Sequence, residues 1–123
     1  MLTDTTFWID LLRERNRRQH GPASHFIATH RAIRFRVSVV TWGELAEGFA
    51  STHDLALALR RVRLLFLPQQ VVWEASRIAR QMSGQRLDEN DNWIAATTRV
   101  WGLRLLTRDA AFDRVPRLTV VNY

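Results

Sequence analysis

Four acidic residues stand at four separate points of the chain, each where a strand-like run gives way to a helix or turn. They are Asp4, Glu44, Asp91 and Asp109. Ligand sites in open parallel sheets form outside the carboxyl ends of the strands, so residues this far apart in sequence can meet there. Carboxylate oxygens suit hard divalent cations such as Mg²⁺ or Mn²⁺. The pattern therefore predicts a metal-dependent enzyme that acts on phosphodiester bonds.

Each acid also has an ordinary structural interpretation. Thr41 and Glu44 have the spacing of a capping box, which satisfies two backbone donors at a helix start. Asp4 and Asp91 are suited to helix capping, and Asp109 to a turn or cap. Asp88, Glu89 and Asp113 flank the proposed site and are expected to be solvated. Four acids at strand ends together favour one shared site over four separate caps.

Composition limits the classes of function. The 123 residues are 46% hydrophobic, which is enough for one core, and no run approaches the roughly 18 apolar residues of a membrane helix. Cysteine is absent and the start, MLTDTTFWID, lacks the pattern of a secretory signal, so a cytoplasmic location is expected. All 18 basic residues are arginine and the net charge is +6, which favours a polyanionic partner such as nucleic acid.

Strand and helix patterns alternate along the chain. Such alternation predicts an α/β fold, a three-layer sandwich with a mainly parallel sheet of four to five strands flanked by helices, in one domain over residues 1–123. The pattern predicts strands at 1–3, 35–40, 64–67, 103–107 and 119–121, and helices at 5–15, 24–31, 41–50, 52–63, between Pro68 and Gly84, and at 91–101. The tryptophans fall at helical spacings, which predicts that they lie in the core.

These motifs resemble the PIN-domain nucleases, and among them the VapC-type toxins of bacterial toxin–antitoxin pairs, over nearly the whole chain. The resemblance rests on Asp4-Thr5-Thr6, on VSVVT at 37–41 with Glu44, on NDNWIAA at 90–96, and on LTRD at 106–109 with Phe112. It implies that Asp4, Glu44, Asp91 and Asp109 bind the metal and are catalytic. It gives Thr6 and Thr107 supporting positions. Thr3 departs from the family pattern, which has an apolar residue before the first aspartate.

The resemblance implies a Mg²⁺- or Mn²⁺-dependent endoribonuclease that hydrolyses RNA with a metal-activated water. It also implies a cognate antitoxin and a homodimer. Arginines are expected to hold the RNA backbone, with Arg13, Arg15 and Arg108 as candidates. The apolar residues of the first two helices are expected to exceed what the sheet needs, and so to receive the antitoxin (Phe7, Trp8, Leu11, Phe26, Ile27).

Other functional classes stay open from the residues alone. A non-catalytic RNA-binding or assembly module would use the acids only as caps, and a DNA-directed nuclease would share the same fold. A phosphoacceptor receiver domain is disfavoured, because its mechanism needs a lysine and this chain has none. A histidine-based ribonuclease would have to draw on His20, His25, His30 or His53, which lie in the first half, away from the acidic motifs.

Overall fold

In the computed structural model, which describes residues 1–123, five short strands form one sheet in the order β3-β2-β1-β4-β5. Every neighbouring pair is parallel. The strands are β1 (Leu2–Thr3), β2 (Arg36–Ser38), β3 (Arg63–Leu65), β4 (Leu105–Leu106) and β5 (Val120–Val121). The predicted three-layer α/β fold with a parallel sheet is confirmed.

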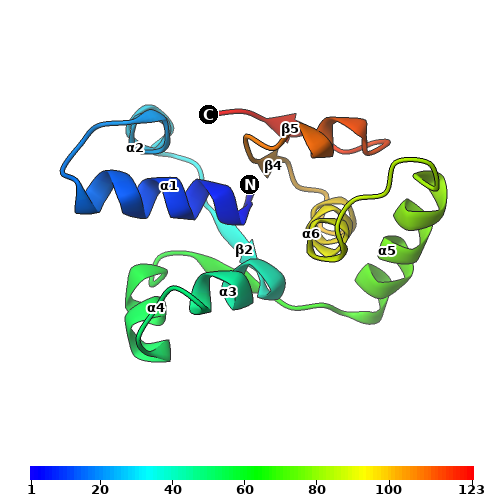
Figure 1. Ribbon diagram of the computed structural model, residues 1–123, viewed down its shortest axis with the longest axis horizontal. Helices are drawn as coiled ribbons and strands as arrows, with labels where there is room; N and C mark the ends of the chain where they lie inside the picture. Colours follow the sequence, from blue (N-terminus) through cyan, green and yellow to red (C-terminus); the bar gives the residue numbers. More distant parts are fainter.

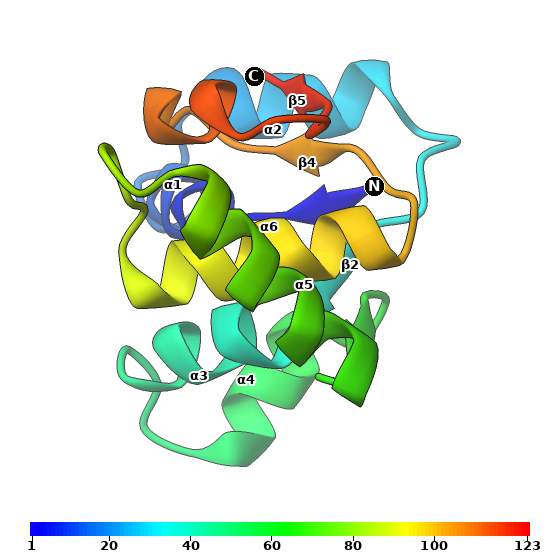
Figure 2. The ribbon, with the colours of Figure 1, turned by 90° about the vertical axis from the view of Figure 1, so that its right-hand side faces the viewer.

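Six α-helices and one 3-10 helix surround this sheet. In Figure 1, α1 and α2 lie on one side of the strands and α5 and α6 on the other, with α3 and α4 below. Figure 2 shows α5 and α6 in front of the sheet. The helices are α1 (Thr5–Asn16), α2 (Pro22–Thr29), α3 (Val39–Ala46), α4 (Thr52–Ala58), α5 (Gln69–Gln81), α6 (Glu89–Val100) and the 3-10 helix η1 (Ala110–Arg114).

The chain reverses its winding direction at β1. From this central strand, β2 and then β3 are added on one side, and β4 and then β5 on the other. Leu2 is in register with Arg36 of β2 and with Leu105 of β4. Connections that leave in opposite directions open a crevice at the carboxyl end of such a strand. Asp4 directly follows β1 and therefore lies at this switch point.

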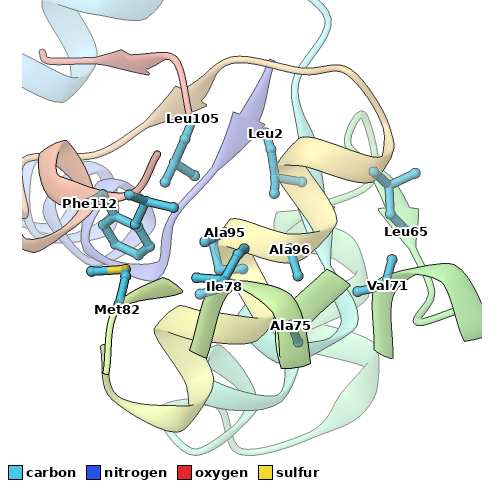
Figure 3. Close-up of a cluster of buried hydrophobic side chains, with 12 residues drawn as sticks. Leu2, Leu65, Val71, Ala75, Ile78, Met82, Ala95, Ala96, Leu105 and Phe112 are labelled. Atoms are coloured by element: carbon cyan, nitrogen blue, oxygen red, sulfur yellow. The ribbon is translucent and has the colours of Figure 1, made fainter. Parts of the chain in front are cut away.

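Two apolar clusters cover the two faces of the sheet. Leu105 belongs to the cluster beneath α5 and α6, whereas its neighbour Leu106 belongs to the cluster with α1 and α2. This division follows from the two-residue period of a strand, which sends successive side chains to opposite faces. Figure 3 shows the first cluster, where Ile78 of α5 and Ala95 of α6 lie beside each other and Leu105 extends from β4 on the side of the sheet. Strands β1 and β4 are thus buried on both faces of the sheet.

The strand predicted at 35–40 is shorter than expected. Strand β2 ends at Ser38, whose hydroxyl accepts a hydrogen bond from the backbone N–H of Thr41 at 3.0 Å and so caps α3. Val39 and Val40 have strand propensity, but the cap places them in the first helical turn. The alternative interpretation of Thr41 and Glu44 as a capping box is therefore wrong, because Thr41 already lies inside the helix.

The start of α2 also differs from the prediction. The helix begins at Pro22 with Gly21 as its N-cap, and Ser24 lies in the first turn rather than at the cap. The Glu14 carboxylate of α1 accepts hydrogen bonds from the backbone N–H groups of Ala23, at 3.0 Å, and Ser24, at 2.7 Å. A side chain from the preceding helix therefore caps α2, which a local sequence pattern does not reveal.

The surplus apolar surface expected on α1 and α2 is wrong as well. Phe7, Trp8, Leu11 and Phe26 are buried in the second cluster, and Ile27 is partly buried against it.

Two of the tryptophans expected in the core are exposed instead, since Trp73 is 64% and Trp101 is 44% accessible. Helical spacing identifies a face of a helix, but it does not show whether another element covers that face.

Candidate active site

Asp4 is a buried carboxylate at the centre of the site. It is 3% exposed and follows the switch-point strand. Its Oδ1 accepts from the backbone N–H of Thr5 at 2.6 Å, and its Oδ2 accepts from the hydroxyls of Thr6 and Thr107, each at 2.8 Å. Both threonines in the expected supporting positions thus contact Asp4. Thr107 also accepts from the backbone N–H of Asp109 at 3.0 Å, which ties the end of β4 to this carboxylate.

Glu44 reaches the same region from the second turn of α3. Its Oε2 accepts a hydrogen bond from the Thr5 hydroxyl, and its Oε1 accepts from the Asn90 side-chain amide at 2.8 Å. Thr5 follows Asp4 and Asn90 precedes Asp91, so Glu44 connects the two segments that carry these aspartates. Asn90 and Thr5 belong to the motifs that carry the family resemblance, but no role was predicted for either residue. Their positions directly beside two of the acids were the available signal.

Asp91 and Asp109 lie at the starts of two further helices. Asp91 is half-buried in the first turn of α6, where the N-cap position belongs to Asp88. Asp109 is the N-cap of η1, and its Oδ1 accepts from the backbone N–H of Ala111 at 2.7 Å. Asp109 therefore has the capping role considered from sequence, and it has that role within the same region as the other acids.

Electrostatic coupling shows that the four acids share one neighbourhood. Burial is the main cause that raises the pKa of Asp91 to about 6, and the charges of Asp4, Asp109, Asp88 and Glu44 raise it further. Burial also raises the pKa of Asp4, although the hydrogen bonds from Thr107, Thr6 and Thr5 oppose the rise. The charge on Glu44 adds to the increase at Asp4. A buried carboxylate whose ionisation is disfavoured by neighbouring carboxylates is typical of a cation site.

The acids are not arranged as a formed coordination sphere. No three His, Asp or Glu side chains are placed to hold one metal ion together. Internal donors occupy the carboxylates of Asp4, Glu44 and Asp109, and uncompensated negative charges repel one another. The all-oxygen donor set and the raised pKa of Asp91 nevertheless fit a hard divalent cation, which would relieve this repulsion.

Arg108 lies between Thr107 and Asp109 and is held by two residues that the sequence did not single out. Its Nη2 is 2.5 Å from Oδ2 of Asp10, and its guanidinium lies over the Tyr123 ring, 5.4 Å from the centroid. The Tyr123 hydroxyl donates to the same Asp10 oxygen at 2.8 Å. Burial and the Asp10 carboxylate raise the pKa of Tyr123, so its hydroxyl stays protonated as a donor. Asp10 and Tyr123 are 113 residues apart, so no local sequence pattern predicts that they hold Arg108.

The remaining candidates lie away from the acids. Arg13 and Arg15 are exposed near the end of α1, and Arg15 lines a groove between α1 and α4. Three histidines line a separate hollow beside α2 (His20, His25, His30), where the His30 ring stacks on Phe26 with centroids 4.1 Å apart. This placement does not favour histidine acid–base catalysis at the acidic site.

Comparisons with known proteins agree with the geometry. The PIN domain model matches residues 1–118. Ribonuclease VapC4 from Mycobacterium tuberculosis is 30% identical over 97 residues, and the match covers 70% of this chain and 75% of that protein.

Solved structures give the same fold. The chain matches VapBC-1 from nontypeable Haemophilus influenzae with a TM-score of 0.81 at 24% identity, covering 98% of this chain and 96% of that chain. It matches FitAcB from Neisseria gonorrhoeae with a TM-score of 0.74 at 20% identity, over the same shares of the two chains. The resemblance expected from the motifs is confirmed, and the chain belongs to the PIN-domain family.

Proposed function

We propose that the chain is a metal-dependent endoribonuclease and the toxin of a toxin–antitoxin pair, with one nuclease domain over residues 1–123. The observation that carries the proposal is that Asp4, Glu44 and Asp109 lie close enough to Asp91, at the switch point of the sheet, for their charges to raise its pKa. The relationship to a ribonuclease of the VapC type supports RNA as the substrate.

Asp4, Glu44, Asp91 and Asp109 would hold Mg²⁺ or Mn²⁺. When bound, such a cation supplies charge that activates water and stabilises the oxygens around a reacting phosphorus. The protein's own contribution is to fix the ligands. Thr6 and Thr107 orient Asp4, while Thr5 and Asn90 orient Glu44, so these carboxylates are pre-positioned before substrate arrives.

Arginines outside the acids would bind the RNA backbone. Arg108 has a side chain that is half exposed, and its contacts with Asp10 and Tyr123 fix its direction beside Thr107 and Asp109. A guanidinium held in this way binds phosphate with little loss of rotamer freedom. Arg13 and Arg15 would extend the basic surface along α1.

A groove between α1 and α4 would bind the antitoxin. It has a volume of about 650 Å³, and apolar side chains including Ile27, Ile33 and Leu57 line it. Arg15, Arg34, Arg60 and Arg61 line it too, against one acid, Asp54. This combination suits an amphipathic segment with acidic residues beside its apolar face. A solved structure with this fold is a toxin–antitoxin complex, which supports a partner of this kind.

We also propose that the protein acts in the cytoplasm and forms a homodimer. None of the helices has the length and apolar character needed to cross a bilayer. Exposed apolar side chains on α5 and α6 provide surface for self-association (Val72, Trp73, Val100).

The direct test uses the purified chain, separated from any partner, with single-stranded RNA. Cleavage is expected with Mg²⁺ or Mn²⁺, it should stop with EDTA, and the products should carry 5′-phosphates. A DNA strand of the same sequence tests the DNA-directed alternative. Cleavage that persists in EDTA and leaves cyclic phosphates would contradict the metal-dependent mechanism, and the absence of cleavage with intact metal binding would favour a non-catalytic module.

A further inference from the structure

A second charged site lies at the other end of α6 from Asp91. The last turn of α6, the middle of α5 and the segment before β5 enclose a hollow of about 470 Å³. Its lining includes Glu74 and Arg77 from α5, Arg99 from α6, and Arg117 and Thr119 ahead of β5. Because α6 begins at Glu89 and ends at Val100, its length separates this hollow from the acids at its first turn.

The hollow contains more positive than negative charge. Nη2 of Arg99 is 2.7 Å from Oε1 of Glu74, and Nη1 of Arg77 is 3.2 Å from Oε2 of the same carboxylate. One carboxylate therefore serves two guanidinium groups, and Arg117 adds a third. Three positive charges against one negative charge leave an excess of two positive charges along the wall of this open hollow.

Arg99 gives this hollow the character of a built site. Its side chain is 6% exposed although it carries a permanent charge. Burial is the main cause that lowers the pKa of Arg99, Glu74 partly offsets that effect, and the charges of Arg117 and Arg77 lower the pKa further. The charges of Arg117 and Arg77 thus repel that of Arg99 in the folded protein, and an anion between them would reduce this repulsion.

The backbone at Arg117 has an unusual conformation. Its φ of 58° lies in the left-handed region, which residues other than glycine and asparagine rarely adopt. The chain nevertheless has a long basic side chain there, and this side chain lines the hollow. Backbone strain at a residue that faces a charged hollow is consistent with a binding role.

We infer that this hollow binds a phosphate group, with Arg77 and Arg117 as its contacts and Arg99 fixed at its base by Glu74. Guanidinium groups bind phosphate oxygens through paired charge-assisted hydrogen bonds, and the Thr119 hydroxyl adds a neutral donor. The phosphate can come from free inorganic phosphate or from an RNA backbone, and the experiment below separates these sources. The site does not depend on the nuclease assignment.

The first arm of the test measures thermal melting of the whole chain in inorganic phosphate, against chloride at equal ionic strength. Phosphate should raise the melting temperature of the wild type, because a ligand that binds only the folded state stabilises it. Arg117→Asn removes the charge but keeps a residue that tolerates positive φ. Its phosphate affinity should fall by roughly tenfold, as expected for the loss of one arginine–phosphate contact.

Arg18→Asn is the matched control. Arg18 is also exposed and has a φ of 51°, but it does not line the hollow, so the variant has the same chemical change at the same backbone conformation. It should keep the wild-type response to phosphate. Arg77→Gln provides a second variant of the site, and its phosphate affinity should fall as that of Arg117→Asn does. Equal responses in all four proteins, or no response beyond that to chloride, would overturn the proposal.

The second arm identifies the source of the phosphate. Binding of a labelled single-stranded RNA in EDTA is compared between wild type and Arg117→Asn. Weaker RNA binding by the variant would assign the site to the RNA backbone, and unchanged RNA binding with a lost phosphate response would assign it to free phosphate. Loss of ribonuclease activity in metal is not a readout here, so failure of the nuclease assignment leaves this test intact.

Discussion

Asp91 lies in the first turn of α6 but does not cap that helix. Asp88 occupies the cap position, and even its side chain makes no capping hydrogen bond. The charges that raise the pKa of Asp91 come from carboxylates, three of which belong to other elements. Its ionised form is therefore disfavoured by folding, which is the opposite of what a helix-capping aspartate shows. The charge of Asp91 therefore lowers the stability of the folded protein, and a bound cation would reverse this effect.

Replacing Asp91 with Asn should separate metal binding from helix stability. In EDTA at neutral pH, Asp91→Asn is expected to be as stable as the wild type or more stable. The substitution removes the repulsion between Asp91 and its neighbouring carboxylates, and it does not remove a helix cap. Mg²⁺ or Mn²⁺ should raise the melting temperature of the wild type, whereas most of this increase should be absent in Asp91→Asn. RNA cleavage should be lost as well.

Asp88→Asn is the control for this comparison. It makes the same change three residues earlier on the same helix, at an exposed position. We expect this variant to keep the metal-induced increase in melting temperature. Equal increases in all three proteins would mean that Asp91 is not a ligand.

At the scale of elements, the connection between α1 and α2 depends on Glu14. Burial acts to raise its pKa, but hydrogen bonds from Ser24 and Ala23 outweigh that effect, and the pKa of Glu14 is lowered below its ordinary value of 4.5. A Cβ at Gly21 would lie 2.3 Å from Oε1 of Glu14. A side chain at position 21 would therefore displace the Glu14 carboxylate from the place where it caps α2.

The sign of the Glu14 shift sets a pH dependence. A lowered pKa in the folded state gives stability that is complete above pH 4.5 and is lost as the pH falls through the folded pKa. Glu14→Gln should lower the free energy of unfolding by about 1 kcal/mol at pH 7, a typical value for a lost cap at a partly exposed site. Urea unfolding at pH 7 and at about pH 3 should show the gap between the proteins narrowing in acid. A gap that is constant with pH would mean that the charge of Glu14 does not matter.

The elements differ in how well the sequence predicts them. Strand and helix order, and the parallel sheet, follow from alternating apolar patterns that any chain of this kind must satisfy. The boundaries at Ser38 and Gly21 were missed because a cap decides each one, and at Gly21 the capping carboxylate lies on another helix. Local propensity favoured a longer strand through Val40, and the cap at Ser38 overrode it.

At the scale of the whole molecule, the candidate site joins the end of β1, α3, the start of α6 and the turn after β4. The sequence identified an acid in each of these segments, because acids at strand ends form a recognisable pattern. The contacts that fix the acids were not predictable in the same way, since the bonds of Thr5 and Asn90 to Glu44 cross 39 and 46 residues. The contact of Tyr123 with Asp10 spans 113 residues and depends on the sheet being formed.

The groove between α1 and α4 does not include the acids at the carboxyl ends of the strands. Antitoxin binding and catalysis should therefore be separable by mutation. Leu57 is 52% exposed on α4 and lines the groove. Leu57→Asp places a charge where the antitoxin's apolar side chains would contact the toxin. Affinity for the proposed antitoxin should fall by roughly thirtyfold, as for the loss of an interface hot spot. RNA cleavage should be unchanged, since no side chain near Asp4 is altered.

Phe66→Asp serves as the control for the groove. Phe66 is 67% exposed just after β3 and does not line the groove, so the variant introduces the same charge on an apolar site elsewhere. It should bind the antitoxin as the wild type does, as measured by titration of the purified proteins. In cells, Leu57→Asp should stay toxic when the antitoxin is co-expressed, whereas wild type and Phe66→Asp should be neutralised. Equal loss of affinity in both variants would place the antitoxin outside this groove. If the antitoxin binds in the groove, only the substitution at Leu57 should weaken its binding.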